Sequence, residues 1–332
     1  MLPVPCDTAD RMQSILVVTL PLFALVLCGY LAARRQLLPE AAVPGLNAYV
    51  LYFALPCMLF RFGASMPFAT LIDPALIGVY ALCGLVLVAL TVTATRRRVG
   101  LKDAAFGALV AVFPNSGFMG VPLLVALHGE AAAGPVIGTL LVDLFLTSTL
   151  CLALAHAESA STDHDTGSAW RSAARALRAA LANPQPWAIT LGALAAATNL
   201  ALPAPLAQFV KMLADSASPV ALFTIGAVLW RAGRHAHTRT PLRDYLPIAL
   251  VKLLLHPLLV AAVGLAARAA GLPVSGFGLT VLVLAAALPS ASNVSLLAER
   301  FGADNGRVAR IIMASTALAF VTLTLIAWAL RT

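Results

Sequence analysis

The stretch Phe113-Pro114-Asn115-Ser116-Gly117-Phe118-Met119-Gly120-Val121-Pro122 interrupts a long apolar segment of the chain. A second apolar segment is interrupted by Leu288-Pro289-Ser290-Ala291-Ser292-Asn293-Val294-Ser295. Proline removes a helical hydrogen bond, and glycine tolerates unwound backbone. Each break lies roughly 10–15 residues into its segment, which at about 1.5 Å per residue is near the centre of a bilayer. The sequence therefore predicts two helices that are broken at membrane depth.

Composition places the whole chain in a membrane. Of its 332 residues 61% are hydrophobic and 11% are charged, and the mean hydropathy is +0.91. Soluble domains carry about 25% charged residues, and disordered chains are less hydrophobic. The formal net charge of +8 comes from short basic runs between apolar segments, as in membrane topology signals, so no nucleic-acid partner is expected. These values indicate a polytopic membrane protein.

Ten apolar segments are long enough to be spans. If they alternate across the membrane, the loops on one side hold 16 Lys and Arg residues and the other side holds 4. Such an excess marks the cytoplasmic side, so we expect both termini outside the cytoplasm. The segments lie at about 13–32, 41–62, 74–94, 103–128, 133–155, 184–202, 205–230, 245–269, 276–300 and 308–330.

A longer loop divides the chain into two halves of five spans, residues 1–155 and 184–332. Because five is odd, two structural repeats of this size must be inverted in the membrane. In the linker of residues 156–183, Trp170, Leu177 and Leu181 share one helical face while three Arg residues share another. This pattern predicts either a short amphipathic helix on the inner membrane surface or a solvated linker helix.

The two breaks occupy matching places in the two halves, in the fourth and ninth segments. Irregular backbone at this depth survives where it is buried in protein or lines a cavity, and paired breaks mark the binding site of many transporters. The alternative is two ordinary proline kinks. If the second half of each segment begins at the midplane, two helix N-termini point at one place and favour an anion. The amides of Asn115 and Asn293 would add donors.

The first break, Phe113-Pro-Asn-Ser-Gly-Phe-Met-Gly-Val-Pro-Leu-Leu, resembles the fourth-span motif of the auxin efflux carrier family. Leu46-Asn-Ala-Tyr-Val-Leu-Tyr-Phe-Ala-Leu-Pro56 resembles its second span, and nearly the whole chain is similar. The resemblance implies ten transmembrane helices in two inverted five-helix repeats with crossing broken helices 4 and 9, as in sodium/proton antiporters and bile-acid carriers. It implies carriage of malonate or a similar organic acid, as in bacterial members. The candidate substrate-binding residues are Pro114, Asn115, Ser116, Gly117, Pro289, Ser290, Ser292, Asn293 and, from the second span, Asn47.

The chain also departs from the plant members of that family. Its central loop is short, and its ninth-span motif has Asn four residues after the proline where plant members have a Pro-Gln-Gly type. These departures argue against auxin as the substrate.

Ionisable residues inside spans are costly and usually functional. Asp143 lies near the centre of the fifth segment, and Lys252 and His256 lie one turn apart in the eighth. We expect Asp143 and Lys252 to contact substrate or to couple transport to an ion, and to interact directly or through water. His256 is equally well explained as a packed helix residue. Lys211 and Asp215, near the end of the seventh segment, fit either a local ion pair or side chains that extend to the membrane surface.

The sequence thus predicts a secondary transporter, of symport type, that moves a mono- or dicarboxylate across a bacterial inner membrane by alternating access. Its expected partners are the anion, a proton or sodium ion and the lipid bilayer, and homodimer formation is left open. No enzyme motif is present, and no cofactor or metal is expected. A membrane sensor or channel for a small anion on the same scaffold is the alternative.

Overall fold

The computed structural model describes residues 8–65, 72–160, 178, 181–235 and 240–330. Within these residues all the regular secondary structure is helical, apart from one isolated bridge between Pro114 and Ser290. The helices are α1 (Thr8–Arg34), α2 (Ala42–Tyr49), α3 (Leu55–Ser65), α5 (Pro74–Val112), α6 (Val121–His128), α7 (Ala133–Val142), α8 (Ser148–Ala160), α10 (Pro184–Ala197), α11 (Ala204–His235), α12 (Leu242–Leu250), α13 (His256–Ala269), α14 (Gly276–Ala286), α15 (Val294–Arg300) and α16 (Asn305–Ala329).

Four π-helical turns and one 3₁₀ turn join several of these helices. The π turns are η1 (Val50–Ala54), η2 (Ser116–Gly120), η4 (Asp143–Thr147) and η5 (Val251–Leu255), and the 3₁₀ turn is η3 (Glu130–Ala132). Each π turn places an extra residue in the helix, and such turns are frequent at functional sites. Sequence patterns predicted none of the four.

Seven helical stretches in the described part of the chain are long and apolar enough to cross a membrane, which confirms the prediction of an all-helical membrane protein. They are Ile15–Arg34, Ala42–Ser65, Pro74–Val112, Glu130–His156, Ala204–Arg231, Leu242–Ala269 and Asn305–Ala329. Two shorter apolar helices, Ser116–His128 and Gly276–Ala286, belong to the interrupted segments.

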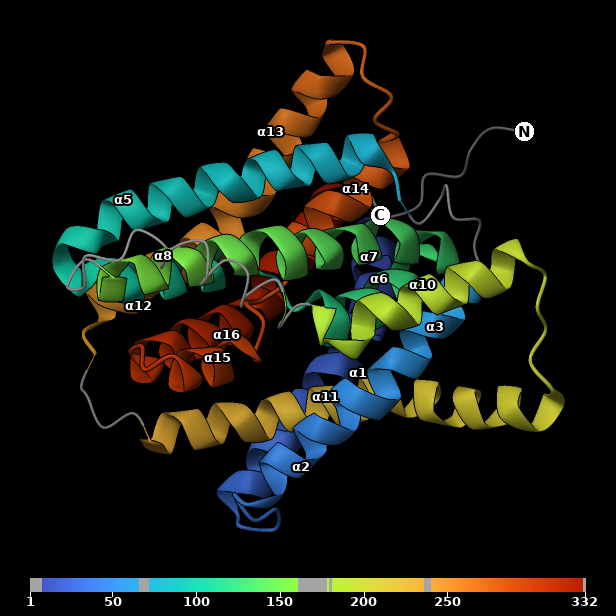
Figure 1. Ribbon diagram of the computed structural model, residues 1–332, viewed down its shortest axis with the longest axis horizontal. Coiled ribbons are helices and arrows are strands. Elements are labelled where there is room, and N and C mark those ends of the chain that lie inside the picture. The colour runs from blue at the N-terminus through green and yellow to red at the C-terminus, as the bar shows by residue number, and fades with distance from the viewer. Residues whose placement is uncertain (1–7, 66–71, 161–177, 179–180, 236–239, 331–332) are drawn as a thin grey trace.

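The third segment and the first part of the fourth carry the single label α5. They are two helices that meet at a non-helical residue, Gly100, where φ is +82°. Because side chains strain a left-handed backbone, glycine suits this turn, and the chain folds back on itself there (Figure 1). The expected sixth segment is shorter than predicted, since α10 ends at Ala197.

The helices pack as two groups (Figure 1). In one group α1 packs on α11, and α3 packs on both α10 and α11. In the other, α5 packs on α8 and α13, α13 packs on α14, and α12 packs on α16. We name these the α1–α11 group and the α5–α14 group.

Close glycine contacts hold the α1–α11 group together. A Cβ atom on Gly29 of α1 would lie 1.8 Å from the backbone oxygen of Phe223, and one on Gly226 of α11 would lie 1.9 Å from that of Val26. Gly192 of α10 is similarly close to the backbone of α3. Small residues let helix backbones approach closely in membranes, so these helices form a tightly packed unit.

The expected amphipathic helix of the linker lies mostly outside the described residues, because 161–177 and 179–180 are not among them. The described chain resumes shortly before Asn183, whose side chain accepts the backbone N–H of Gln185 at 3.0 Å and so caps the first turn of α10.

Candidate functional site

The two broken segments meet at their breaks. The backbone N–H of Asn115 donates to the Pro289 oxygen at 2.8 Å, and that of Ala291 donates to the Phe113 oxygen at 3.0 Å. These bonds form the short antiparallel bridge between Pro114 and Ser290. Each break thereby satisfies backbone groups of the other, which explains how unwound chain survives at this depth.

A small cavity lies beside this crossing, with a volume of about 20 Å³. Asn115 and Asn293 both line it, one from each break, so the structure brings these two sequence-predicted residues to one place. Such a volume holds about one water molecule. The remaining lining residues are Leu51, Leu55, Phe113, Pro114, Gly117, Phe118, Leu140, Gln185 and Ala291.

Several other predicted site residues have local structural partners. The Ser290 hydroxyl donates to the Val110 oxygen at 2.6 Å, and the Ser116 hydroxyl lies 3.3 Å from that of Thr139. Both contacts tie a break to a neighbouring helix. Ser292 and Asn47 are buried, but neither is among the residues that line the cavity at the crossing.

Lys252 is fully buried and contacts both broken segments. Its ammonium donates to the Val112 oxygen at 3.2 Å and to the Ala286 oxygen at 3.0 Å, and it lies 3.0 Å from Nδ1 of His256. Val112 and Ala286 are the last residues of α5 and α14, where carbonyl groups lack helical partners and carry partial negative charge. Because an ammonium has three donors, all of them are used here.

The N-termini of the second halves were expected to converge on one place. Asn115 directly precedes the π turn η2, Asn293 directly precedes the seven-residue helix α15, and both residues line the cavity at the crossing. The contact of Lys252 with the C-termini of the first halves is an additional feature that sequence reasoning did not predict.

Asp143 is also fully buried, at the first position of the π turn η4. One carboxylate oxygen accepts the Tyr80 hydroxyl at 2.9 Å, and the other accepts the Thr147 hydroxyl at 3.2 Å. Among the ion pairs of the described residues, none joins Asp143 to Lys252. The expected interaction, direct or through water in one transport state, is therefore not a direct ion pair in this conformation, although the two residues interact electrostatically.

Tyr80 and His256 connect Asp143 to Lys252. The Tyr80 ring lies against the His256 ring with centroids 5.5 Å apart, while its hydroxyl bonds Asp143. His256 accepts from Lys252 through Nδ1, so its proton is on Nε2, and Nε2 has no hydrogen-bond partner. Sequence reasoning missed Tyr80, which lies in an apolar segment with no charged neighbour. The contact between Lys252 and His256 was predictable, because the two residues are spaced one helical turn apart.

A larger cavity, of about 540 Å³, lies between α6 and the helices α3, α10 and α11. Arg61, Glu130 and Asp215 line it together with apolar residues. Arg61 pairs with Asp215 at 2.9 Å, and Lys211 pairs with the same carboxylate at 2.5 Å, which confirms the predicted i,i+4 pair. This cavity has the volume that small ligands require.

Comparison with known proteins gives matches along nearly the whole chain. Residues 14–327 match the family described as "Membrane transport protein". The "Putative malonate transporter" of Rhizobium meliloti (strain 1021) is 28% identical, with 96% of this chain and 97% of that one covered. The "Uncharacterized transporter YfdV" of Escherichia coli (strain K12) is 26% identical over 91% of this chain and 93% of its own. An "Uncharacterized transporter" of Methanothermobacter thermautotrophicus is 27% identical, with 92% and 95% covered.

Proposed function

Because the chain belongs to the membrane transport protein family, the auxin efflux carrier family that its motifs resemble, we propose that it is a secondary transporter of a small organic anion. The observation that carries this proposal is the cavity at the crossing, where Asn115 and Asn293 from the two breaks lie together. Amide groups donate hydrogen bonds to a carboxylate. The name of the Rhizobium relative supports malonate or a similar dicarboxylate as the substrate class.

The proposed architecture is ten spans in two inverted repeats, residues 1–155 and 184–332. Pro114 lies thirteen residues after the start of its helical run at Leu101, and Pro289 lies thirteen residues after Gly276. In the proposed repeats, α1 of the first half corresponds to α10 of the second, and α3 corresponds to α11, so the α1–α11 contact corresponds to the α10–α3 contact. The close glycine contacts support this correspondence, because Gly29 lies five residues before the end of α1 and Gly192 lies five residues before the end of α10.

Alternating access would arise from movement between the two helix groups. The cavity at the crossing holds about one water, so a carboxylate requires it to widen. Its lining residues come from the α1–α11 group and from the breaks: Leu55 lies on α3 and Gln185 on α10, whereas Asn115 and Asn293 lie in the two breaks. Sliding of one group against the other would therefore open the site.

Asp143 and Lys252 are proposed to couple substrate charge to a cation. Both residues are fully buried, and in the proposed mechanism a carboxylate on Asp143 balances the ammonium of Lys252. If Asp143 takes a proton, the positive charge of Lys252 loses its counter-charge. Lys252 contacts Val112, which directly precedes the crossing, so a bound carboxylate would restore the balance. Proton and anion would then move together.

Counterflow in proteoliposomes tests the proposed function. Liposomes loaded with unlabelled malonate should take up labelled malonate, and other small carboxylates should compete while their neutral amide analogues should not. Currents without counterflow would instead identify an anion channel. Equal competition by acid and amide would refute an anion site.

A further inference from the structure

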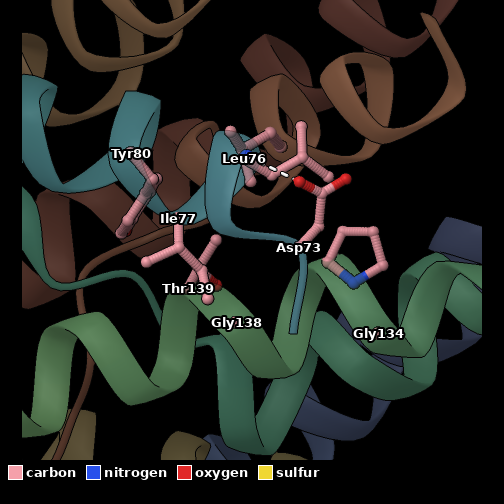
Figure 2. Close-up of a pocket in the computed structure, with 9 residues that line it drawn as sticks. Asp73, Leu76, Ile77, Tyr80, Gly134, Gly138 and Thr139 are labelled. Atoms are coloured by element: carbon pink, nitrogen blue, oxygen red, sulfur yellow. Dashed lines mark hydrogen bonds between the residues drawn. The ribbon is translucent and has the colours of Figure 1, made fainter. Parts of the chain in front are cut away.

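A narrow crevice runs between the first turns of α5 and the helix α7 (Figure 2). Asp73 lines the crevice at the start of α5, which it caps by accepting the N–H of Ala75 at 2.9 Å. The lining residues follow helical spacing along both helices. They are Asp73, Leu76, Ile77 and Tyr80 along α5, Gly134, Pro135, Gly138 and Thr139 on α7, and Leu282 on α14.

The crevice leads toward Asp143. Tyr80, at its inner end on α5, donates its hydroxyl to the Asp143 carboxylate. On the opposite wall Thr139 lies four residues before Asp143, which is one helical turn on the same face. The row of residues that starts at the half-buried Asp73 therefore ends at the buried carboxylate of Asp143.

The size of the crevice limits what can pass along it. Its volume is about 10 Å³, close to the space that a single water molecule needs, so an organic anion is far too large. Hard metal cations take about six oxygen ligands. The side-chain oxygens of the lining belong only to Asp73, Tyr80 and Thr139, and the Thr139 hydroxyl already donates to the Val136 oxygen. A proton is the species that fits.

We propose that protons reach Asp143 from the Asp73 face through this crevice, with Tyr80 as the last proton carrier. The inference rests on the proposed transport function, to which it adds the route of the coupling proton. A protonated water in the crevice gives one proton to the Tyr80 oxygen as the Tyr80 O–H bond breaks and an O–H bond forms on Asp143. Tyr80 ends neutral, Asp143 becomes neutral, and one proton has been taken from the Asp73 side.

The groups around this route are arranged to respond to that proton. Tyr80 and Cys83 face it from α5, Cys151 from α8, and Lys252 and His256 from the stretch of η5 and α13. Among them, His256 has the unpartnered nitrogen Nε2, although the residue is fully buried. Because Tyr80 contacts both Asp143 and His256, protonation of Asp143 changes the surroundings of the Lys252–His256 pair.

Gly138 offers a variant that narrows the crevice without disrupting the fold. A Cβ atom at Gly138 would lie 3.5 Å from Cγ1 of Ile77 on the opposite wall, which is ordinary contact. Gly138→Ala should therefore obstruct the route while the helices stay in place. Gly78→Ala is the matched control, because Gly78 is on the exposed face of α5 and its added methyl would meet nothing within 4 Å.

The test compares two modes of malonate uptake in proteoliposomes. One is counterflow at equal pH, and the other is uptake driven by a pH gradient, with an internal pH dye that follows protons. We expect Tyr80→Phe to reduce gradient-driven uptake at least tenfold more than counterflow, and Gly138→Ala to slow it several-fold. Gly78→Ala should match the wild type. Wild-type rates of gradient-driven uptake in Tyr80→Phe, or uptake driven by sodium alone, would overturn the inference.

A second measurement needs no substrate. The infrared C=O band of the protonated carboxyl group that disappears in Asp143→Asn should form more slowly after a pH step in Tyr80→Phe and Gly138→Ala. Equal rates in all variants would refute the crevice as the route. Absence of counterflow for every carboxylate would reject the proposed function, whereas intact counterflow without proton-driven uptake would reject this inference alone.

Discussion

Lys252 holds three groups that would otherwise lack a partner: the last carbonyl oxygens of α5 and α14 and the Nδ1 atom of His256. Burial of a charge in apolar surroundings costs roughly several kcal/mol of folding free energy, unless hydrogen bonds and a counter-charge offset that cost. Asp143 supplies the counter-charge without direct contact. The two residues should therefore behave as one energetic unit.

A double-mutant cycle measures the interaction energy between Asp143 and Lys252. Asp143→Asn leaves the ammonium of Lys252 without its counter-charge, and Lys252→Gln does the same to the carboxylate. We expect each single change to lower the free energy of unfolding by about 3 kcal/mol and the double change to cost at least 1 kcal/mol less than their sum. Thermal unfolding of the purified protein in detergent gives these values. Strict additivity would show that the two charges are satisfied separately.

Asn115 and Asn293 are expected to hold the substrate carboxylate. Removal of a hydrogen-bond donor to a charged group costs about 1–3 kcal/mol, so Asn115→Ala and Asn293→Ala should each weaken malonate binding tenfold or more. Competition in the counterflow assay gives the affinity. Thr93→Ala, on an exposed face of α5, serves as the control. Unchanged affinity in both Asn variants would place the site elsewhere.

Sequence alone identified several residues of the site because their chemistry is unusual for their place. Asp143 and Lys252 are charges deep inside apolar segments, and Asn115 and Asn293 lie in proline-interrupted motifs. Tyr80 carried no such signal, since its contact with Asp143 joins residues 63 positions apart. Asn47 was predicted from the resemblance, but it does not line the cavity at the crossing.

At the scale of elements, proline positions predicted the breaks, while the π turns could not be predicted. A proline cannot donate a backbone hydrogen bond, so Pro114 and Pro289 mark the interruption in any fold. A π turn depends on tertiary contacts, and both Asp143 and Lys252 lie in one. The turn at Gly100 falls in the loop predicted between the third and fourth segments, although the short basic run around it kept helical geometry on both sides.

The contact between α1 and α11 should depend on two glycines. A methyl group at Gly226 would lie 1.9 Å from the backbone oxygen of Val26, so Gly226→Ala must force the helices apart. We expect a loss of about 3 kcal/mol of unfolding free energy, at the upper end for an overpacked site. Thermal unfolding measures it, with Gly45→Ala as the control because nothing lies within 4 Å there. Equal stability of the two variants would contradict the close contact.

At the scale of the whole molecule, composition was sufficient to predict an all-helical membrane protein, and the seven long apolar helices confirm it. The two packing groups were not predictable, since they join α1 to α11 and α3 to α10 across the two halves of the chain. Hydropathy identifies segments but does not identify which segments pack together. The cross-half contacts are also the strongest support for inverted repeats.

The orientation of the protein is the last prediction. The loops that follow the odd-numbered segments hold 16 of the Lys and Arg residues, and the other loops and the two termini hold 4, so the Arg97 turn should face the cytoplasm and the loop at Glu130 the outside. This orientation places Asp73 outside as well, at the start of the proton route. Reporter fusions after Arg97 and after Glu130 should be active in the cytoplasm and in the periplasm, respectively. The opposite pattern of reporter activity would mean that the protein has the reverse orientation in the membrane. The protons that reach Asp143 through the crevice would then come from the cytoplasm.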